Sequence, residues 1–322
     1  MFSFLKVVVT CAALVLHLAV PALAQSWPTK PIRVVVPFAP GGSTDLTARV
    51  LGESLRAVVG QPIVIDNRPG ASGSIAGDTV AKAAPDGYTF LTASATLVAN
   101  MNLYKNLPYD FIRDLAPVTQ TYFSTNVLVV SRKVPVNNLS EFIAYVKSGK
   151  ATVHYGTAGH GSSQHLAAAL FNQMVGGNMV HVPYKGGAPA MIDLVGGTID
   201  SIFSPLIEAL PHIKSGALKP LGVCGLRRSP LVADAPLISD LLPGYLSTSW
   251  NGIFAPVKTS PEIVNSMNAA LLKVLTVPAV KTHFAESDKE AVGNSPAEFK
   301  RFIAEEAKRL SEQVRISGAK VE

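Results

Sequence analysis

The sequence predicts an α/β protein built from two lobes, each a mainly parallel sheet flanked by helices. Two stretches of the chain alternate short β-branched runs with segments of helical periodicity, which is typical of doubly wound parallel sheets. Glycine-rich turns follow strands in both stretches, where such sheets bind ligands. The mature length of about 300 residues also fits two domains of about 150 residues each.

The first stretch opens with the β-branched run Ile32–Val36, which predicts a buried parallel strand. A helical pattern of apolar residues follows and ends at Gly60. Further strands are expected at Ile63–Ile65 and Tyr88–Ala93, with a helix from Ser72 to Ala84 between them. The order strand, helix, strand, helix, strand predicts one α/β unit.

An extended segment, Tyr122–Val130, crosses into a second α/β unit. Its expected strands are 153–156, 180–184, 199–203 and 220–224, and its expected helices are 138–147, 162–174, 188–195 and 207–214. The chain then returns to the first unit, where Pro261 starts one helix and a capping box at Ser295 starts the last one, near 296–316. Lobe 1 is therefore expected at 25–122 and 228–322, and lobe 2 at 123–227.

The first 24 residues are expected to be a secretory signal peptide. A short basic start, Met1–Lys6, precedes an apolar run over Val7–Val20, and Ala22 and Ala24 are the small residues before a cleavage site. We expect cleavage after Ala24 and a periplasmic mature protein. The apolar run is shorter than the roughly 20 residues that span a bilayer, and Cys11 lies inside it.

Composition argues against three properties: an internal disulfide, nucleic acid binding and a membrane span. Cys224 is the one cysteine of the expected mature chain, so an internal disulfide cannot form. The formal charge of the full chain is +6, but the basic residues are scattered, which argues against nucleic acid binding. No segment after the leader is apolar enough to predict a membrane span.

Three glycine-rich segments, 41–45, 156–163 and 184–189, stand where a strand gives way to a helix. The first N–H groups of a helix lack partners within it, and the helix dipole adds positive charge there. Glycine lets a ligand approach the backbone, so an anion can be held without a dedicated cation. The alternative is that these glycines only form turns, with Asp45 and Ser162 as capping or first-turn residues. Three such segments favour the ligand interpretation.

These segments belong to a set of motifs that closely resembles the Bug proteins, the substrate-binding receptors of tripartite tricarboxylate transporters. The matching motifs are WPTKPIR at 27–33, VPFAPGGSTD at 36–45, DNRPGASG at 66–73, APDGYT at 84–89, GSSQHL at 161–166, HVPYKGGAPA at 181–190 and WNGIFAP at 250–256. They cover nearly the whole mature chain and are far more specific than a lone glycine motif.

The resemblance implies a two-lobed periplasmic binding protein of type II, with its ligand cleft between the lobes, and a receptor that is not an enzyme. It implies capture of a small carboxylate by hinge motion near 122–126 and 224–227. A membrane transporter or a sensor kinase would be the downstream partner. We expect a monomer without cofactor or metal. The implied contacts are Phe38, Ala39, Gly41, Thr44, Asp45, Ala93 and Ser94 in lobe 1, and Thr157, Gly161, Ser162 and His165 in lobe 2.

The chain departs from the family pattern after the strand that ends at Phe203. The family often has an acidic residue there, and this chain has Ser204, which is also expected at the ligand. The usual Pro-Thr-Leu is replaced by residues 236–238, Pro-Leu-Ile. Because loss of an acid from the cleft would disfavour a ligand amine, the sequence favours a plain or aromatic acid over an amino acid.

Two other interpretations concern histidines. His154, His160, His165 and His181 lie close in sequence, but no pair has metal-ligand spacing on one helix and no cysteine joins them, so surface or packing roles are favoured. His165 is expected in the first turn of a cleft-facing helix. Together with Ser162 it leaves a periplasmic hydrolase as the alternative function. The G-x-S-x-G elbow fails, because His165 occupies the second glycine position.

Overall fold

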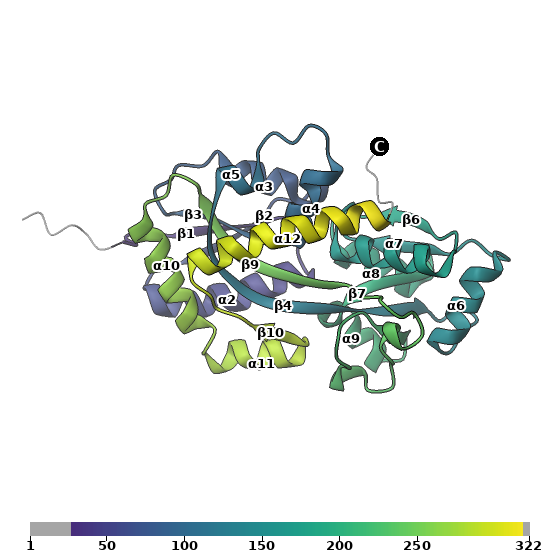
Figure 1. Ribbon diagram of the computed structural model, residues 1–322. Helices are drawn as coiled ribbons and strands as arrows, with labels where there is room; N and C mark the ends of the chain where they lie inside the picture. The colour runs from purple at the N-terminus through teal and green to yellow at the C-terminus, as the bar shows by residue number, and fades with distance from the viewer. Residues whose placement is uncertain (1–26, 318–322) are drawn as a thin grey trace, which may run out of the picture.

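Strand β4 (Leu115–Ser131) runs through the middle of the molecule and takes part in two half-sheets (Figure 1). Its first part pairs with β9 (Thr248–Pro256), and its last part pairs with β7 (Ser201–Pro205) and β8 (Leu218–Val223). The computed structural model describes residues 27–317, so the expected signal peptide and its cleavage site lie outside the described residues. Each half-sheet, with its helices, forms one lobe.

The first half-sheet has the strand order β2-β1-β3-β9-β4, and β10 pairs with β4. Strand β1 pairs in parallel with β2 and β3, whereas the pairs that involve β9 and β10 are antiparallel. Its strands are β1 (Ile32–Val36), β2 (Ile63–Asn67), β3 (Thr89–Ser94) and β10 (Lys289–Ala291). Its helices are α2 (Ser43–Val59), α3 (Ser74–Ala81), α4 (Ala95–Leu103), α5 (Phe111–Asp114), α10 (Pro261–Val274), α11 (Pro278–Glu286) and α12 (Pro296–Ser317).

The second half-sheet has the order β4-β7-β5-β6, with β8 on β4. Strand β5 (His154–Thr157) pairs in parallel with β6 (Val180–Pro183) and with β7, and β4 pairs antiparallel with β7 and β8. Its helices are α6 (Leu139–Ser148), α7 (Ser163–Val175), α8 (Gly187–Gly196) and α9 (Leu206–Lys214). The expected α/β alternation is confirmed in both lobes, although each sheet is mixed.

Clusters of buried apolar side chains, packed between the sheets and their helices, stabilise each lobe. Phe111, Trp250 and Phe299 belong to one buried cluster of lobe 1, and Phe142 and Phe171 belong to the corresponding cluster of lobe 2. The expected helix caps are present, since the Ser260 hydroxyl accepts the N–H of Ile263 at the start of α10.

The segment between β8 and β9 packs on lobe 2. Val232 and Ala235 are buried against one face of the second half-sheet, and Tyr245 is buried against the other. The Tyr245 hydroxyl donates to the carbonyl oxygen of Ala167 in α7 at 3.0 Å. The segment after residue 227 therefore contacts lobe 2, and the exact lobe boundary stays a prediction.

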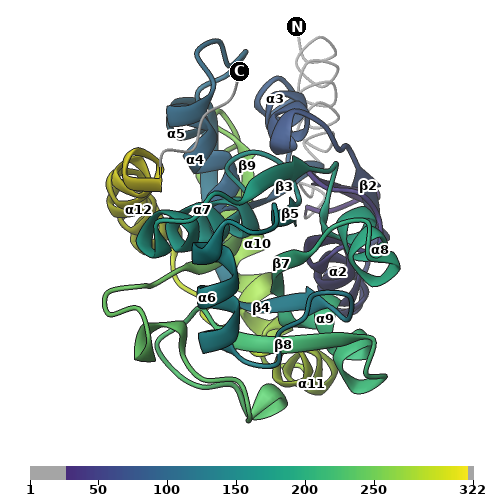
Figure 2. The same ribbon diagram turned by 90° about the vertical axis from the view of Figure 1, so that its right-hand side faces the viewer.

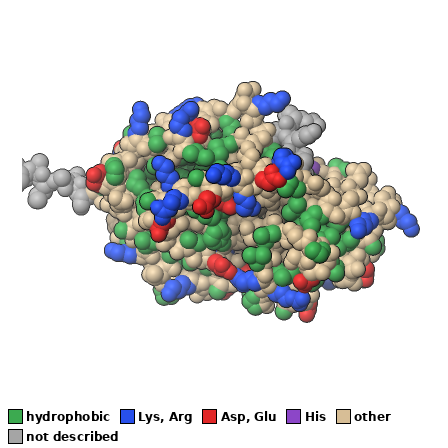
Figure 3. Space-filling model, viewed as in Figure 1, with side chains coloured by type: hydrophobic (Ala, Val, Ile, Leu, Met, Phe, Trp, Pro, Cys, Tyr) green, Lys and Arg blue, Asp and Glu red, His purple; other side chains and the backbone are tan. Residues whose placement is uncertain are grey.

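Two surface properties bear on function. On the face shown in Figure 3, the Lys and Arg side chains are scattered among Asp and Glu side chains, with no continuous basic stripe. Within residues 27–317, no single helix has both the length and the apolar composition of a membrane span; α10 and α11 together reach that composition, but they are bent by 72°.

Candidate functional site

The turn between β1 and α2 places the start of α2 at the boundary between the lobes. Gly41 has a φ of +82°, which glycine adopts without strain. The Asp45 carboxylate accepts the Gly41 N–H at 2.9 Å and the Arg49 Nε–H at 3.0 Å. Burial raises the pKa of Asp45, but hydrogen bonds from Arg49, Gly41 and Asn67 outweigh it and lower that pKa overall. Asp45 is therefore an ionised residue that fixes the shape of the turn.

A small cavity lies where helix starts from the two lobes meet. Lobe 1 contributes the start of α2 and the adjoining parts of β3 and β9, and lobe 2 contributes the starts of α7, α8 and α9. The cavity volume is about 50 Å³, which holds a few water molecules and is far below the roughly 300–1,000 Å³ of typical ligand pockets. Its polar lining includes Ser43, Thr44, Ser94, Gln164, Glu208 and Asn251.

The lobes contact each other around this cavity. The backbone N–H of Ala39 in lobe 1 donates to the carbonyl oxygen of Lys185 in lobe 2 at 3.2 Å. The backbone N–H of Ser43 donates to the Glu208 carboxylate at 2.6 Å. Gly186 approaches so closely that a Cβ there would lie 3.1 Å from the Ala39 nitrogen. The starts of α2 and α8 consequently lie side by side (Figure 2), and the lobes are closed on each other.

Several polar groups on the cavity wall are buried but unpaired. Within residues 27–317, the Ser94 hydroxyl, the Asn251 Nδ2 and the Gln164 Oε1 have no hydrogen-bond partner, and each residue is at least nine-tenths buried. Thr92 donates to the Asn251 Oδ1 at 2.6 Å, so the free amide nitrogen is the remaining donor of that side chain. Because unpaired buried polar groups are costly, this wall is suited to a polar molecule.

The structure separates the expected ligand contacts into two sets. Phe38, Thr44, Ser94 and Ser162 line the cavity, whereas Ala39, Gly41, Asp45, Ala93, Thr157, Gly161, His165 and Ser204 do not. The Ser162 hydroxyl accepts the His165 N–H at the start of α7, as expected for a cap. The His165 Nδ1 accepts the Gly161 N–H at 3.0 Å, so the imidazole is not placed as a base for Ser162.

Residues that sequence reasoning missed include Ser43, Gln164, Asn251 and Glu208, all at the cavity. The expectation that the cleft has lost its acid was wrong, since Glu208 lines the cavity one helical turn beyond Ser204 and is half-buried there. Its position at the start of a helix that follows a strand was the available signal.

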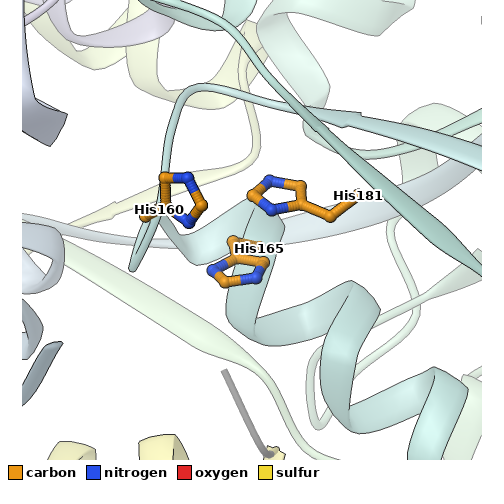
Figure 4. Close-up of side chains that lie close together, drawn as sticks. All are labelled: His160, His165 and His181. Carbon is orange, nitrogen blue, oxygen red and sulfur yellow. The ribbon is translucent and has the colours of Figure 1, made fainter. Parts of the chain in front are cut away.

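Three histidines of lobe 2, His160, His165 and His181, lie close together (Figure 4). His165 and His181 stack with ring centroids 4.0 Å apart, and Tyr155 stacks on His181 at 5.1 Å. His160 meets both histidine rings edge-on. Burial and neighbouring histidines lower the pKa of His165 to about 4 and that of His181 to about 3, so both rings are neutral at pH 7.

The ligand atoms of these three side chains lie within 4.8 Å of one another, so the group could in principle hold a metal ion. Two contacts oppose that use. The planes of His165 and His181 are only 11° apart, so their lone pairs run parallel and do not converge. The His165 Nδ1 is already an acceptor for Gly161, and the His181 Nε2 is bonded to Thr157 at 2.7 Å. The geometry therefore fits a packing cluster.

Comparison with known proteins shows a family match and similar proteins that were solved with bound acids. A family model described as the tripartite tricarboxylate transporter family receptor matches residues 47–318. The protein BugT of Bordetella pertussis is 36% identical over 307 residues, which is 94% of each chain. A solved R. palustris structure with adipate is 34% identical, with a TM-score of 0.88, over 92% of this chain and 100% of that one. MatC from Rhodopseudomonas palustris with bound malate is 32% identical, with a TM-score of 0.85, over 89% and 100%.

Proposed function

The chain belongs to the tripartite tricarboxylate transporter receptor family, and from this premise we propose that it is a periplasmic receptor that closes its two lobes on a small carboxylate. Its fold is the two-lobed type II fold of periplasmic binding proteins, and the family is one of receptors and not of enzymes. The captured solute would pass to a membrane transporter or be reported to a sensor kinase.

One observation carries the proposal. The backbone N–H of Ser43, at the start of α2, already donates to a carboxylate inside the cavity, at 2.6 Å. A helix start binds an anion through its free N–H groups and its dipole, so a solute carboxylate would be recognised in the same way. The unpaired Ser94 and Asn251 groups would serve the rest of the solute or an ordered water.

Two relatives support the ligand class. One was solved with adipate and another with bound malate, and both are dicarboxylates. Because Glu208 lines the cavity, the cleft does contain a carboxyl group, and a plain acid is not favoured over an amino acid. The proposed class is therefore small carboxylates in general, with dicarboxylates as the first probes.

The test is a thermal-shift panel on the mature protein, with adipate, malate, glutamate and benzoate set against adipamide and 1,6-diaminohexane. A ligand that binds only the folded state raises the melting temperature. At least one acid should produce a shift, and calorimetry should give a one-to-one complex. Shifts with the neutral or cationic compounds alone would refute the anion site.

A variant pair locates the binding. Gly42 has an ordinary extended backbone, and a Cβ there would lie 3.5 Å from the Glu208 Oε1, inside the cavity. Gly42→Val should therefore abolish acid binding without straining the turn. Gly196→Ala, whose Cβ meets only Thr198 at 3.9 Å, is the matched control and should bind as the wild type. Undiminished binding by Gly42→Val would place the ligand elsewhere.

A further inference from the structure

The carboxylate of Glu208 occupies the anion site at the start of α2. Glu208 belongs to the first turn of α9 in lobe 2, yet its Oε1 accepts the Ser43 N–H of lobe 1. Its Oε2 accepts from the Gln164 Nε2 at 3.3 Å. We propose that Glu208 is an internal ligand, which holds the receptor closed without solute and which a solute carboxylate must displace. This inference rests on the proposed function for the identity of the competing solute.

Two glycines flank the carboxylate, and Gly187 leaves no room for a Cβ whereas Gly42 would allow ordinary contact. A Cβ on Gly187, at the start of α8, would lie 2.1 Å from the Glu208 Oε2, and one on Gly42 would lie 3.5 Å from the Oε1. The backbone of Gly187 does not have a positive φ, so conformation alone does not demand glycine there. The helix starts of the two lobes thus enclose the carboxylate as they would enclose a bound anion.

Charges on opposite lobes reinforce the contact. Lys289 of lobe 1 is 6% exposed, and its Nζ donates to the Thr47 hydroxyl at 3.0 Å. Burial raises the pKa of Glu208 overall, and the Ser43 N–H and the Lys289 charge oppose that rise by favouring the carboxylate. The carboxylate and the ammonium therefore attract each other across the interface when the lobes close.

The cavity size agrees with an anion site that the Glu208 carboxylate already occupies. About 50 Å³ remains beside Glu208, too little for a dicarboxylate such as adipate, given pockets of roughly 300–1,000 Å³ for small ligands. A solute would have to open the lobes and move the Glu208 side chain aside before it reached the Ser43 N–H. Its apparent affinity is reduced by the fraction of receptor that this internal contact holds closed.

The first measurement needs no solute. Small-angle X-ray scattering in a carboxylate-free buffer should give the wild type a radius of gyration near the ~19 Å of a compact chain of this length. Glu208→Ala removes the internal ligand, and Gly187→Ala expels it by steric clash. Both variants should open, with an increase of roughly 1 Å. Glu53→Ala, at an exposed ion pair on α2, and Gly196→Ala are controls and should match the wild type.

The second measurement is calorimetric titration with adipate and with malate. Loss of a tethered, charge-assisted competitor should tighten binding by about 10- to 100-fold in Glu208→Ala. Gly187→Ala should not show this gain, because its Cβ would also crowd a solute carboxylate at the same position. Equal radii for all proteins, or weaker binding by Glu208→Ala, would overturn the inference, the latter by making Glu208 a contact of the solute. If neither acid binds any of the proteins, the radii alone decide the inference and the proposed function fails separately.

Discussion

Replacing Lys289 with methionine should change the way that stability depends on pH. Lys289 is buried between β10 and α2, close to the Tyr122 ring at 5.1 Å. Burial lowers its pKa from the usual 10.5 to about 7, despite the opposing effect of Glu208. The folded protein therefore releases a proton near neutral pH that the unfolded chain keeps until about pH 10. Raising the pH from 7 towards 10 favours the folded state.

The magnitude follows from those two pKa values. The linkage opposes folding of the wild type by about 4 kcal/mol at pH 7 and by less than about 1 kcal/mol at pH 10. Lys289→Met has no such linkage. The free energy of unfolding of the variant, relative to that of the wild type, should consequently fall by about 3 kcal/mol between pH 7 and pH 10.

Urea unfolding followed by circular dichroism at pH 7, 8, 9 and 10 measures this difference, at one ionic strength throughout. Lys281→Met, at an exposed position on α11, is the control and should give a curve parallel to that of the wild type. A constant difference between the wild type and Lys289→Met at every pH would refute the buried, proton-releasing lysine. A variant whose free energy of unfolding rises relative to that of the wild type between pH 7 and pH 10 would refute the direction of the pKa shift.

Three further outcomes are expected. His181→Phe keeps the ring stack but removes a side chain whose pKa is about 3. Between pH 6.5 and 4 the variant should therefore lose about 2–3 kcal/mol less stability than the wild type. Equal loss of stability in both proteins would argue against the lowered pKa of His181. Burial raises the pKa of Cys224 to about 12, so a thiol reagent at pH 8 should label it only in urea, and rapid native labelling would contradict this. Asn138→Ala removes the N-cap of α6 and should cost about 1 kcal/mol in urea unfolding, whereas Asn137→Ala should leave stability unchanged.

Local patterns predicted most of the fold because strands and helices alternate with clear punctuation. The run Ile32–Val36 and the helix that ends at Gly60 have the expected limits to within a few residues. Helix α4 was missed because it follows β3 within one apolar run, without a glycine or proline to mark the change. Strand β9 was missed because polar Asn251 and Gly252 interrupt its apolar pattern.

The candidate site was only partly predictable, because its chemistry depends on contacts between distant segments. The glycine-rich start of α2 was evident from the sequence, and the structure places it at the cavity. Glu208 accepts a hydrogen bond from Ser43, which is 165 residues away in the sequence, and this contact forms only when the lobes are closed. The histidine cluster likewise needs His181 from β6 beside His165 from α7, which spacing along the chain does not reveal.

The continuity of β4 through both lobes has a consequence for folding. This strand pairs with β9 and β10 on one side of the molecule and with β7 and β8 on the other, so each lobe completes its sheet with part of the same 17-residue strand. A fragment containing one lobe would expose unpaired N–H and C=O groups along a sheet edge, which promotes association with other chains. The two lobes should therefore unfold in one cooperative transition, and a biosensor would have to keep the whole chain and carry its reporter in a surface loop.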